Sequence, residues 1–179
     1  MFACEAAGIV PDIVTLSKAL TGGTMALSAT VARRHVFDAF LSNDPLHALM
    51  HGPTFMGNAL ACAAANASLD LFEREDRLAE VAAISAQLQH ELDPCRDLPG
   101  VVDVRVMGAV GVVQLERIGD MNGLKAALLA EGAWVRPFRD IVYLTPAFTI
   151  TPAELGVLTG AIRTVLQRSW AAPSVPTGD

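Results

Sequence analysis

Charged side chains are scarce in this chain of 179 residues. Asp, Glu, Lys and Arg make up 18% of the sequence, whereas roughly 25% is typical of soluble domains. Hydrophobic residues make up 52%, so the shortage of charge predicts apolar surface that a partner subunit or a further part of the same protein covers. The net charge of −6 provides no basic face, which argues against binding to nucleic acid or to anionic membranes.

Cysteine is also scarce, and the three cysteines, Cys4, Cys62 and Cys95, form no C-x-x-C pair. An odd number without a disulfide framework favours the reducing cytoplasm over secretion. The N-terminus lacks a basic stretch followed by an apolar run, so we expect no signal peptide. No apolar run reaches the roughly 20 residues that a membrane-spanning helix needs. The four histidines lack the spacing of metal ligands, so we expect no metal site.

Lys18 stands out because it carries the only formal charge between Asp12 and Arg33. The residues before it, 13–16, are apolar and β-branched, which predicts a buried strand that ends at the lysine. Such a lysine can extend its amine to water, or it can stay in a dry pocket that disfavours the charged form. The dry pocket would give the neutral amine that a Schiff-base lysine requires. Spacing alone favours the solvated lysine, because perturbed lysines are uncommon.

The pattern of apolar residues and turn signals predicts two domains and a tail. In residues 1–75 we expect two strands and two helices, at residues 13–16, 26–32, 33–41 and 57–73. Residues 76–170 read as an α+β domain, with helices at 76–92, 122–131 and 151–168 and strands at 101–115, 133–136 and 141–144. We place the boundary in the charge run at residues 73–77, and we expect residues 171–179 to be a disordered tail.

The segment His51-Gly52-Pro53-Thr54-Phe55 precedes the long alanine-rich helix. Residues 45–69 contain no Lys, Arg, Asp or Glu. A helix N-terminus with a nearby hydroxyl and no carboxylate can bind an anion, and Thr54 could donate to a phosphate. The alternative is that Thr54 and Asn58 only cap the helix, which is the commoner use of these residues.

Arg136 lies in the segment Trp-Val-Arg-Pro-Phe, on a predicted strand that would point it to the side opposite Val135. A guanidinium that projects into a pocket suits bidentate capture of a substrate carboxylate. The commoner use of such an arginine is a salt bridge, here to Asp140. Tyr143 could line the same pocket, although an ordinary core or interface tyrosine is the simpler reading.

Four segments together resemble a known family. The lysine segment PDIVTLSKALTGG resembles that of the class III aminotransferases, which bind pyridoxal 5′-phosphate in the fold-type I architecture. The segments HGPTFMGNALACAAANAS, DVRVMGAVGVVQLE and WVRPFRDIVYLTP are similar to the branch of that family that serves biotin synthesis. Because of this resemblance we interpret Lys18 as the Schiff-base residue, although spacing alone favours a solvated lysine.

The resemblance implies a role for each candidate residue. Lys18 would bind the cofactor covalently and, once released, move the proton between the substrate carbon and the cofactor. Pro53 and Thr54 would contact the cofactor phosphate, that of the neighbouring subunit in a homodimer. Gly52 would touch the substrate.

The resemblance also implies the substrates and the residues that select them. Arg136 would hold the carboxylate of 8-amino-7-oxononanoate, the amino acceptor, and Tyr143 is a weaker candidate for the same pocket. S-adenosylmethionine would be the amino donor, and 7,8-diaminononanoate the product.

The sequence departs from the family pattern in one respect. Members carry an aspartate that pairs with the pyridine nitrogen, a Gly-Ser phosphate turn and a tyrosine stacked on the cofactor ring, all before the lysine segment, and these are not found here. The resemblance therefore implies an α/β fold-type I fragment, namely the end of the large cofactor domain plus the small α+β C-terminal domain, and this fragment would be inactive alone. The alternatives are a class III aminotransferase with another amine donor and a non-catalytic truncated fragment.

Overall fold

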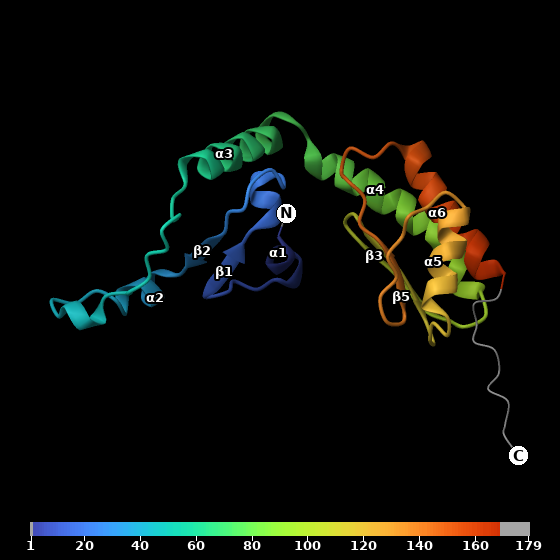
Figure 1. The fold of residues 1–179 in the computed structure, drawn as a ribbon, viewed down its shortest axis with the longest axis horizontal. Helices are drawn as coiled ribbons and strands as arrows, with labels where there is room; N and C mark the ends of the chain where they lie inside the picture. Colours follow the sequence, from blue (N-terminus) through green and yellow to red (C-terminus); the bar gives the residue numbers. More distant parts are fainter. Residues whose placement is uncertain (1, 169–179) are drawn as a thin grey trace, which may run out of the picture. The chain divides into compact units, whose positions relative to one another are not determined.

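The computed structural model describes residues 2–168, and these divide into two compact units (Figure 1). The first unit is Met1–Asp76 and the second is Arg77–Asp179. The division lies within the charge run at residues 73–77. The expected tail at 171–179 lies outside the described residues. No helix within residues 2–168 is both long enough and apolar enough to cross a membrane.

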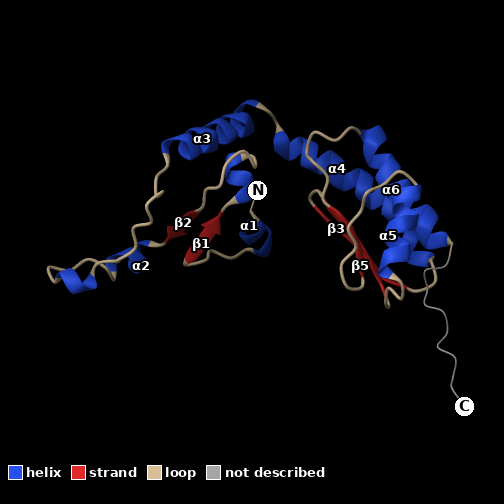
Figure 2. Ribbon diagram, in the orientation of Figure 1, coloured by secondary structure: helices blue, strands red, loops and turns tan. Residues whose placement is uncertain are grey.

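The first unit consists of short elements followed by one long helix (Figure 2). Strands β1 (Ile13–Leu16) and β2 (Ala29–Ala32) pair antiparallel, with Ile13 opposite Ala32 and Leu16 opposite Ala29. Helix α3 (Ala59–Arg74) packs against the 3-10 turn η1 (Lys18–Thr21), and the Ser68 hydroxyl donates to the Ala19 carbonyl over 3.2 Å. The elements are α1 (Ala3–Ala7), β1 (Ile13–Leu16), η1 (Lys18–Thr21), β2 (Ala29–Ala32), α2 (Arg34–Asp38), η2 (Pro45–His47) and α3 (Ala59–Arg74).

Three details of this unit differ from the sequence prediction. Helix α1 was not expected, because no Ser, Thr, Asp or Asn precedes it; instead the Glu5 carboxylate accepts from the Phe2 amide and Gly8 ends the helix with a φ of 65°. Strand β2 and helix α2 are both shorter than predicted. Helix α2 is a single short helix, and its first and last residues, Arg34 and Asp38, form an ion pair of 2.7 Å.

The first unit has almost no buried core. Among its described residues only Thr21, Ala61 and Ala65 are buried. The expectation of a buried strand at 13–16 is wrong, because β1 alternates between exposed and half-buried positions and Ile13 is 53% exposed. The described sheet of this unit has two strands, and none of their positions is buried.

The second unit is an antiparallel sheet covered by helices. The sheet order is β3 (Val101–Met107), β4 (Val110–Leu115) and β5 (Ile141–Leu144), and both pairs are antiparallel. The predicted helices agree with the structure to within a few residues, and the stretch predicted as strand at 101–115 is two strands joined by a turn at residues 108 and 109. The elements are α4 (Arg77–Leu92), η3 (Asp93–Asp97), β3 (Val101–Met107), β4 (Val110–Leu115), α5 (Met121–Ala130), β5 (Ile141–Leu144) and α6 (Pro152–Gln167).

A continuous hydrophobic core holds this unit together. Helix α4 contributes Ile84, Leu88 and Leu92, which recur every four residues and therefore share one face. Gly111 of β4 lets that face approach the sheet, because a Cβ there would stand 2.9 Å from Leu92 Cδ1. Helix α6 begins with a capping box, in which the Thr151 hydroxyl accepts from the Glu154 amide.

The predicted strand at 133–136 is not a strand in the structure. The Val135 amide is used locally, by the Ala133 carbonyl, and Pro137 has no amide to donate, so only Phe138 forms a bridge, to Ile141. The segment nevertheless alternates as an extended chain does. Its buried positions are 133, 135 and 137, and its exposed positions are 134, 136 and 138.

The turn after Phe138 gives a stability prediction. Arg139 has a φ of 55°, a left-handed backbone that strains a residue with a Cβ. We expect Arg139→Gly to raise the free energy of unfolding by about 0.5 kcal/mol, since the relieved strain exceeds the added freedom of the unfolded chain. Gly132, with a φ of 83°, is the matched control, and Gly132→Ala should lower the same quantity by about 1 kcal/mol. Urea unfolding of both variants measures the two changes, and a destabilised Arg139→Gly would contradict the account.

Candidate cofactor and substrate sites

Lys18 lies two residues after the end of β1, at the first position of η1. Its φ is 52°, so it is one of two described non-glycine residues with a left-handed backbone, and such conformations collect at functional sites. Two hydroxyls hold the loop around it: Ser17 Oγ donates to the Leu27 carbonyl over 2.9 Å, and Thr21 Oγ1 donates to the Met25 carbonyl over 2.6 Å. The backbone at the lysine is therefore fixed from both sides.

The amine of Lys18 is not in a dry pocket. The residue is exposed, which agrees with the solvated alternative and not with the buried one. Among residues 2–168, the Lys18 amine has no ion pair and no hydrogen-bond partner. It is thus available for a bond to another molecule.

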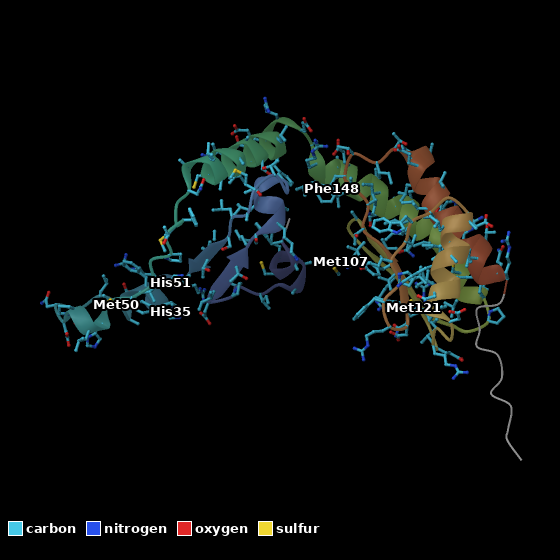
Figure 3. The ribbon with its side chains drawn as sticks, viewed as in Figure 1. His35, Met50, His51, Met107, Met121 and Phe148 are labelled. Carbon is cyan, nitrogen blue, oxygen red and sulfur yellow. The ribbon has the colours of Figure 1, made fainter. Side chains whose placement is uncertain are left out.

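Gly52, Pro53 and Thr54 lie in the segment that leads into α3, and all three are exposed. Figure 3 labels the preceding residues, Met50 and His51, on the same segment. The Pro53 carbonyl accepts from the Met56 amide over 2.9 Å, which folds the segment into a turn. No hydrogen bond within residues 2–168 joins this turn to Lys18, so the two parts of the candidate site stand separately in the single chain.

The two readings of Thr54 and Asn58 are separated by the structure. Asn58 is the cap of α3, because its Oδ1 accepts from the amides of Leu60 and Ala61 at 3.0 and 3.1 Å. Thr54 does not cap the helix. In the described part of the chain neither its amide nor its hydroxyl has a partner. Both groups are thus donors that remain unused in a segment without charged side chains.

Arg136 and Tyr143 share one depression in the second unit. It has a volume of about 390 Å³ and is lined by Trp134, Val135, Arg136, Tyr143, Leu144, Thr145, Pro146 and Leu158. Arg136 is exposed, and within residues 2–168 its guanidinium has no ion pair. The expected alternative partner, Asp140, instead accepts from Gln114 Nε2 over 2.8 Å. The depression therefore presents an unpaired cation beside a phenol.

Sequence reasoning missed Trp134 as a lining residue. Its side chain is 86% exposed, although tryptophan is usually well covered. The period of two that separates it from Arg136 places both on one side of the extended segment, and that spacing was a sufficient signal. Thr145 and Pro146 follow β5 directly and carried no comparable signal.

The comparisons with known proteins agree on the class. The family model described as aminotransferase class-III matches residues 1–166. The chain is 41% identical over 169 residues to the adenosylmethionine-8-amino-7-oxononanoate aminotransferase of Buchnera aphidicola, and 43% identical over 162 residues to that of Mycobacterium leprae. The alignments cover 94% and 90% of this chain, and 39% and 37% of those proteins. This chain belongs to the class III aminotransferase family.

The solved structures place the fold among the same enzymes. The adenosylmethionine-8-amino-7-oxononanoate aminotransferase of Methanocaldococcus jannaschii superposes with a TM-score of 0.83 at 30% identity, over 94% of this chain and 42% of that one. An amine transaminase from an uncultivated Pseudomonas species, in a PLP-bound form, gives 0.81 at 30%, over 92% and 40%. The fold is that of a part of the fold-type I transaminases, and the chain spans about two fifths of the length of the relatives it matches.

Proposed function

We propose that this chain is the C-terminal part of a transaminase that moves an amino group from S-adenosylmethionine to 8-amino-7-oxononanoate, giving the diamine precursor of biotin. The observation that carries the proposal is the unpaired Arg136 beside Tyr143 in one depression, within a chain about 40% identical to curated relatives of that name. The acceptor has one carboxylate at the end of an aliphatic chain. A guanidinium at the rim of an apolar depression matches that shape and charge.

The residues present fit pyridoxal 5′-phosphate. Lys18 offers an exposed amine that no described side chain engages, and Thr54 offers two donors in a stretch free of carboxylates. The Lys18 amine suits the aldehyde of the cofactor, and the Thr54 donors suit its phosphate. When bound, the cofactor supplies an electron sink for negative charge at the substrate carbon that bears nitrogen.

Lys18 acts in this proposal through its Nζ atom. Its amine would hold the cofactor through the aldehyde and, once free, would take up and return a proton at the substrate carbon. The fixed backbone on both sides of Lys18 limits the positions that this atom reaches, which favours a defined proton path. Pro53 sets the turn that presents Thr54 to the phosphate, and Gly52 leaves room for substrate.

The exposed apolar surface of the first unit supports a homodimer. Large side chains on this unit stand open to solvent, among them Phe55 at 80%, Met50 at 79% and Val10 at 73%. Apolar patches of this kind mark surfaces that other protein covers. We propose that a second subunit and the rest of the enzyme cover them, and that Thr54 faces the cofactor of the second subunit. We also propose a cytoplasmic location, from the free cysteines.

A completed enzyme tests the proposal. It consists of this chain joined to the region of the Mycobacterium leprae relative that the chain does not match. Purified with pyridoxal 5′-phosphate, it should form 7,8-diaminononanoate from the two proposed substrates. Transfer from other amines with no use of S-adenosylmethionine would instead favour an amine transaminase, in line with the Pseudomonas neighbour. No transfer from any donor, with the cofactor bound, would favour a non-catalytic fragment.

Arg136→Gln gives a sharper prediction on the completed enzyme. The variant keeps hydrogen-bond donors but loses the charge that pairs with the acceptor carboxylate. We expect the KM for 8-amino-7-oxononanoate to rise about 100-fold while kcat changes much less, since a charge-assisted bidentate contact is lost from bound substrate. Steady-state kinetics with varied acceptor measures the change. An unchanged KM would remove Arg136 from the substrate site.

A further inference from the structure

A relay of hydrogen bonds crosses the sheet of the second unit, on the face that Gln114 shares with Tyr143 of the depression. Arg105 Nη1 donates to Asp103 Oδ2 over 3.0 Å and to Gln114 Oε1 over 2.8 Å. Gln114 Nε2 then donates to Asp140 Oδ2 over 2.8 Å. The relay thus runs from β3 through β4 to the turn that begins β5.

Gln114 is the one group in the relay that both donates and accepts. A guanidinium only donates and an ionised carboxylate only accepts, so these neighbours fix which way the amide faces. An amide at this position links a cation to an anion without adding charge of its own. Neither a charged nor an apolar side chain of similar length could make both contacts.

The relay matters for Arg136 because of what it does to the acids nearest in sequence. Asp140 lies four residues after Arg136 and is held by Gln114, whereas Glu131, five residues before it, pairs with Arg168 over 2.8 Å. Arg136 itself has no ion pair within residues 2–168. The two acids nearest to Arg136 in the sequence are therefore both engaged by other side chains.

We propose that Gln114 is a positioning residue that keeps Arg136 available to a substrate carboxylate by holding Asp140 toward β4. This inference rests on the proposed function of Arg136. Without the amide donor, the Asp140 carboxylate loses its tie to Gln114 and becomes a competitor for the Arg136 guanidinium, four residues away along the chain. The substrate must then displace an internal anion before it binds.

The test uses Gln114→Met in the completed enzyme. Methionine approximates the length of glutamine but makes neither contact. We expect the KM for 8-amino-7-oxononanoate to rise about fivefold, the cost of displacing a partly exposed ion pair, with kcat within about twofold of the parent. The methyl ester of the same acceptor has no carboxylate, so its KM should not change. Adding Asp140→Asn to Gln114→Met removes the competitor and should restore the KM for the acid.

A matched control separates this role from a general loss of stability. Gln87 also makes two contacts through its amide, to Pro152 O over 2.8 Å and to Glu91 Oε1 over 3.0 Å, away from the depression. Gln87→Met should lower the melting temperature and leave the KM for the acid unchanged. If Gln114→Met does not fold, Gln114→Asn, which keeps the amide one methylene short of Asp140, is expected to give the same KM increase.

The outcomes distinguish the inference from the function beneath it. If Arg136→Gln raises the KM but Gln114→Met does not, or if Asp140→Asn fails to restore it, the positioning role is wrong and the substrate site stands. If Arg136→Gln leaves the KM unchanged, Arg136 does not bind the acceptor and both proposals fall together. An equal KM increase for the acid and its ester would overturn the positioning role as well.

Discussion

Lys18→Ala in the completed enzyme is expected to abolish covalent attachment of pyridoxal 5′-phosphate and to lower kcat at least about 10³-fold. The same amine attaches the cofactor and moves the substrate proton, so one substitution removes both functions. Borohydride reduction followed by peptide mass mapping measures the attachment directly. In the parent enzyme the cofactor mass should appear on the peptide that contains residue 18, and in the variant it should appear nowhere.

Lys125 supplies the control for this experiment. It is the other lysine of the two in this chain, and it is exposed on helix α5 of the second unit. Lys125→Ala should keep the cofactor attached and leave kcat within about twofold, because substitution of an exposed surface lysine changes the folded structure little. Label on Lys125, or label that survives Lys18→Ala, would contradict the assignment of the cofactor lysine.

Residues 77–168 are expected to fold cooperatively when made alone, whereas residues 2–76 are not. The second unit has a continuous core of nineteen buried residues, but the first unit buries only Thr21, Ala61 and Ala65 among its described residues. A folded domain typically has a free energy of unfolding of roughly 5–15 kcal/mol. A unit without a core cannot reach this value, because it buries too little apolar surface to offset the conformational entropy lost on folding. Urea unfolding followed by circular dichroism should show a single steep transition for residues 77–168 only.

Two residues make that experiment specific. Leu88 is fully buried, so Leu88→Ala should lower the free energy of unfolding of residues 77–168 by about 3 kcal/mol. Cys95 is the only thiol in that piece, and burial raises its pKa to about 11, so it should react with a thiol reagent only when the unit opens. Rapid labelling of Cys95 in the parent piece, or a steep transition for residues 2–76, would refute the division into one self-sufficient and one dependent unit.

The helices of the second unit could be read from the sequence because local signals and packing agree there. Leu88 and Leu92 recur at helical spacing and are buried, and Thr151 with Glu154 forms the cap that their spacing predicts. The strand expected at 133–136 was wrong for a reason that periodicity cannot reveal. The alternation of apolar residues was present, but Pro137 has no amide and Val135 bonds locally, so no ladder forms.

The candidate site divides in the same way. The position of Arg136 on an exposed side followed from period-two spacing, and the structure adds that Asp140 is engaged by Gln114 instead. Spacing alone favoured the solvated Lys18 that the structure shows, whereas the buried strand expected before it does not occur, because burial depends on layers that residues 13–32 do not provide themselves. The type and spacing of the candidate residues can be read from the sequence, whereas the burial of those residues depends on the other elements that pack on the sheet.

At Lys18 the proposed reaction and the stability of the fold favour different residues, because the backbone there is left-handed. Glycine is the residue that this conformation prefers, and glycine has no amine. A chain that retains lysine there gives up about 1–2 kcal/mol of conformational stability at one position. Selection for conformational stability alone would therefore favour glycine at this position, and glycine cannot perform the proposed chemistry because it has no amine.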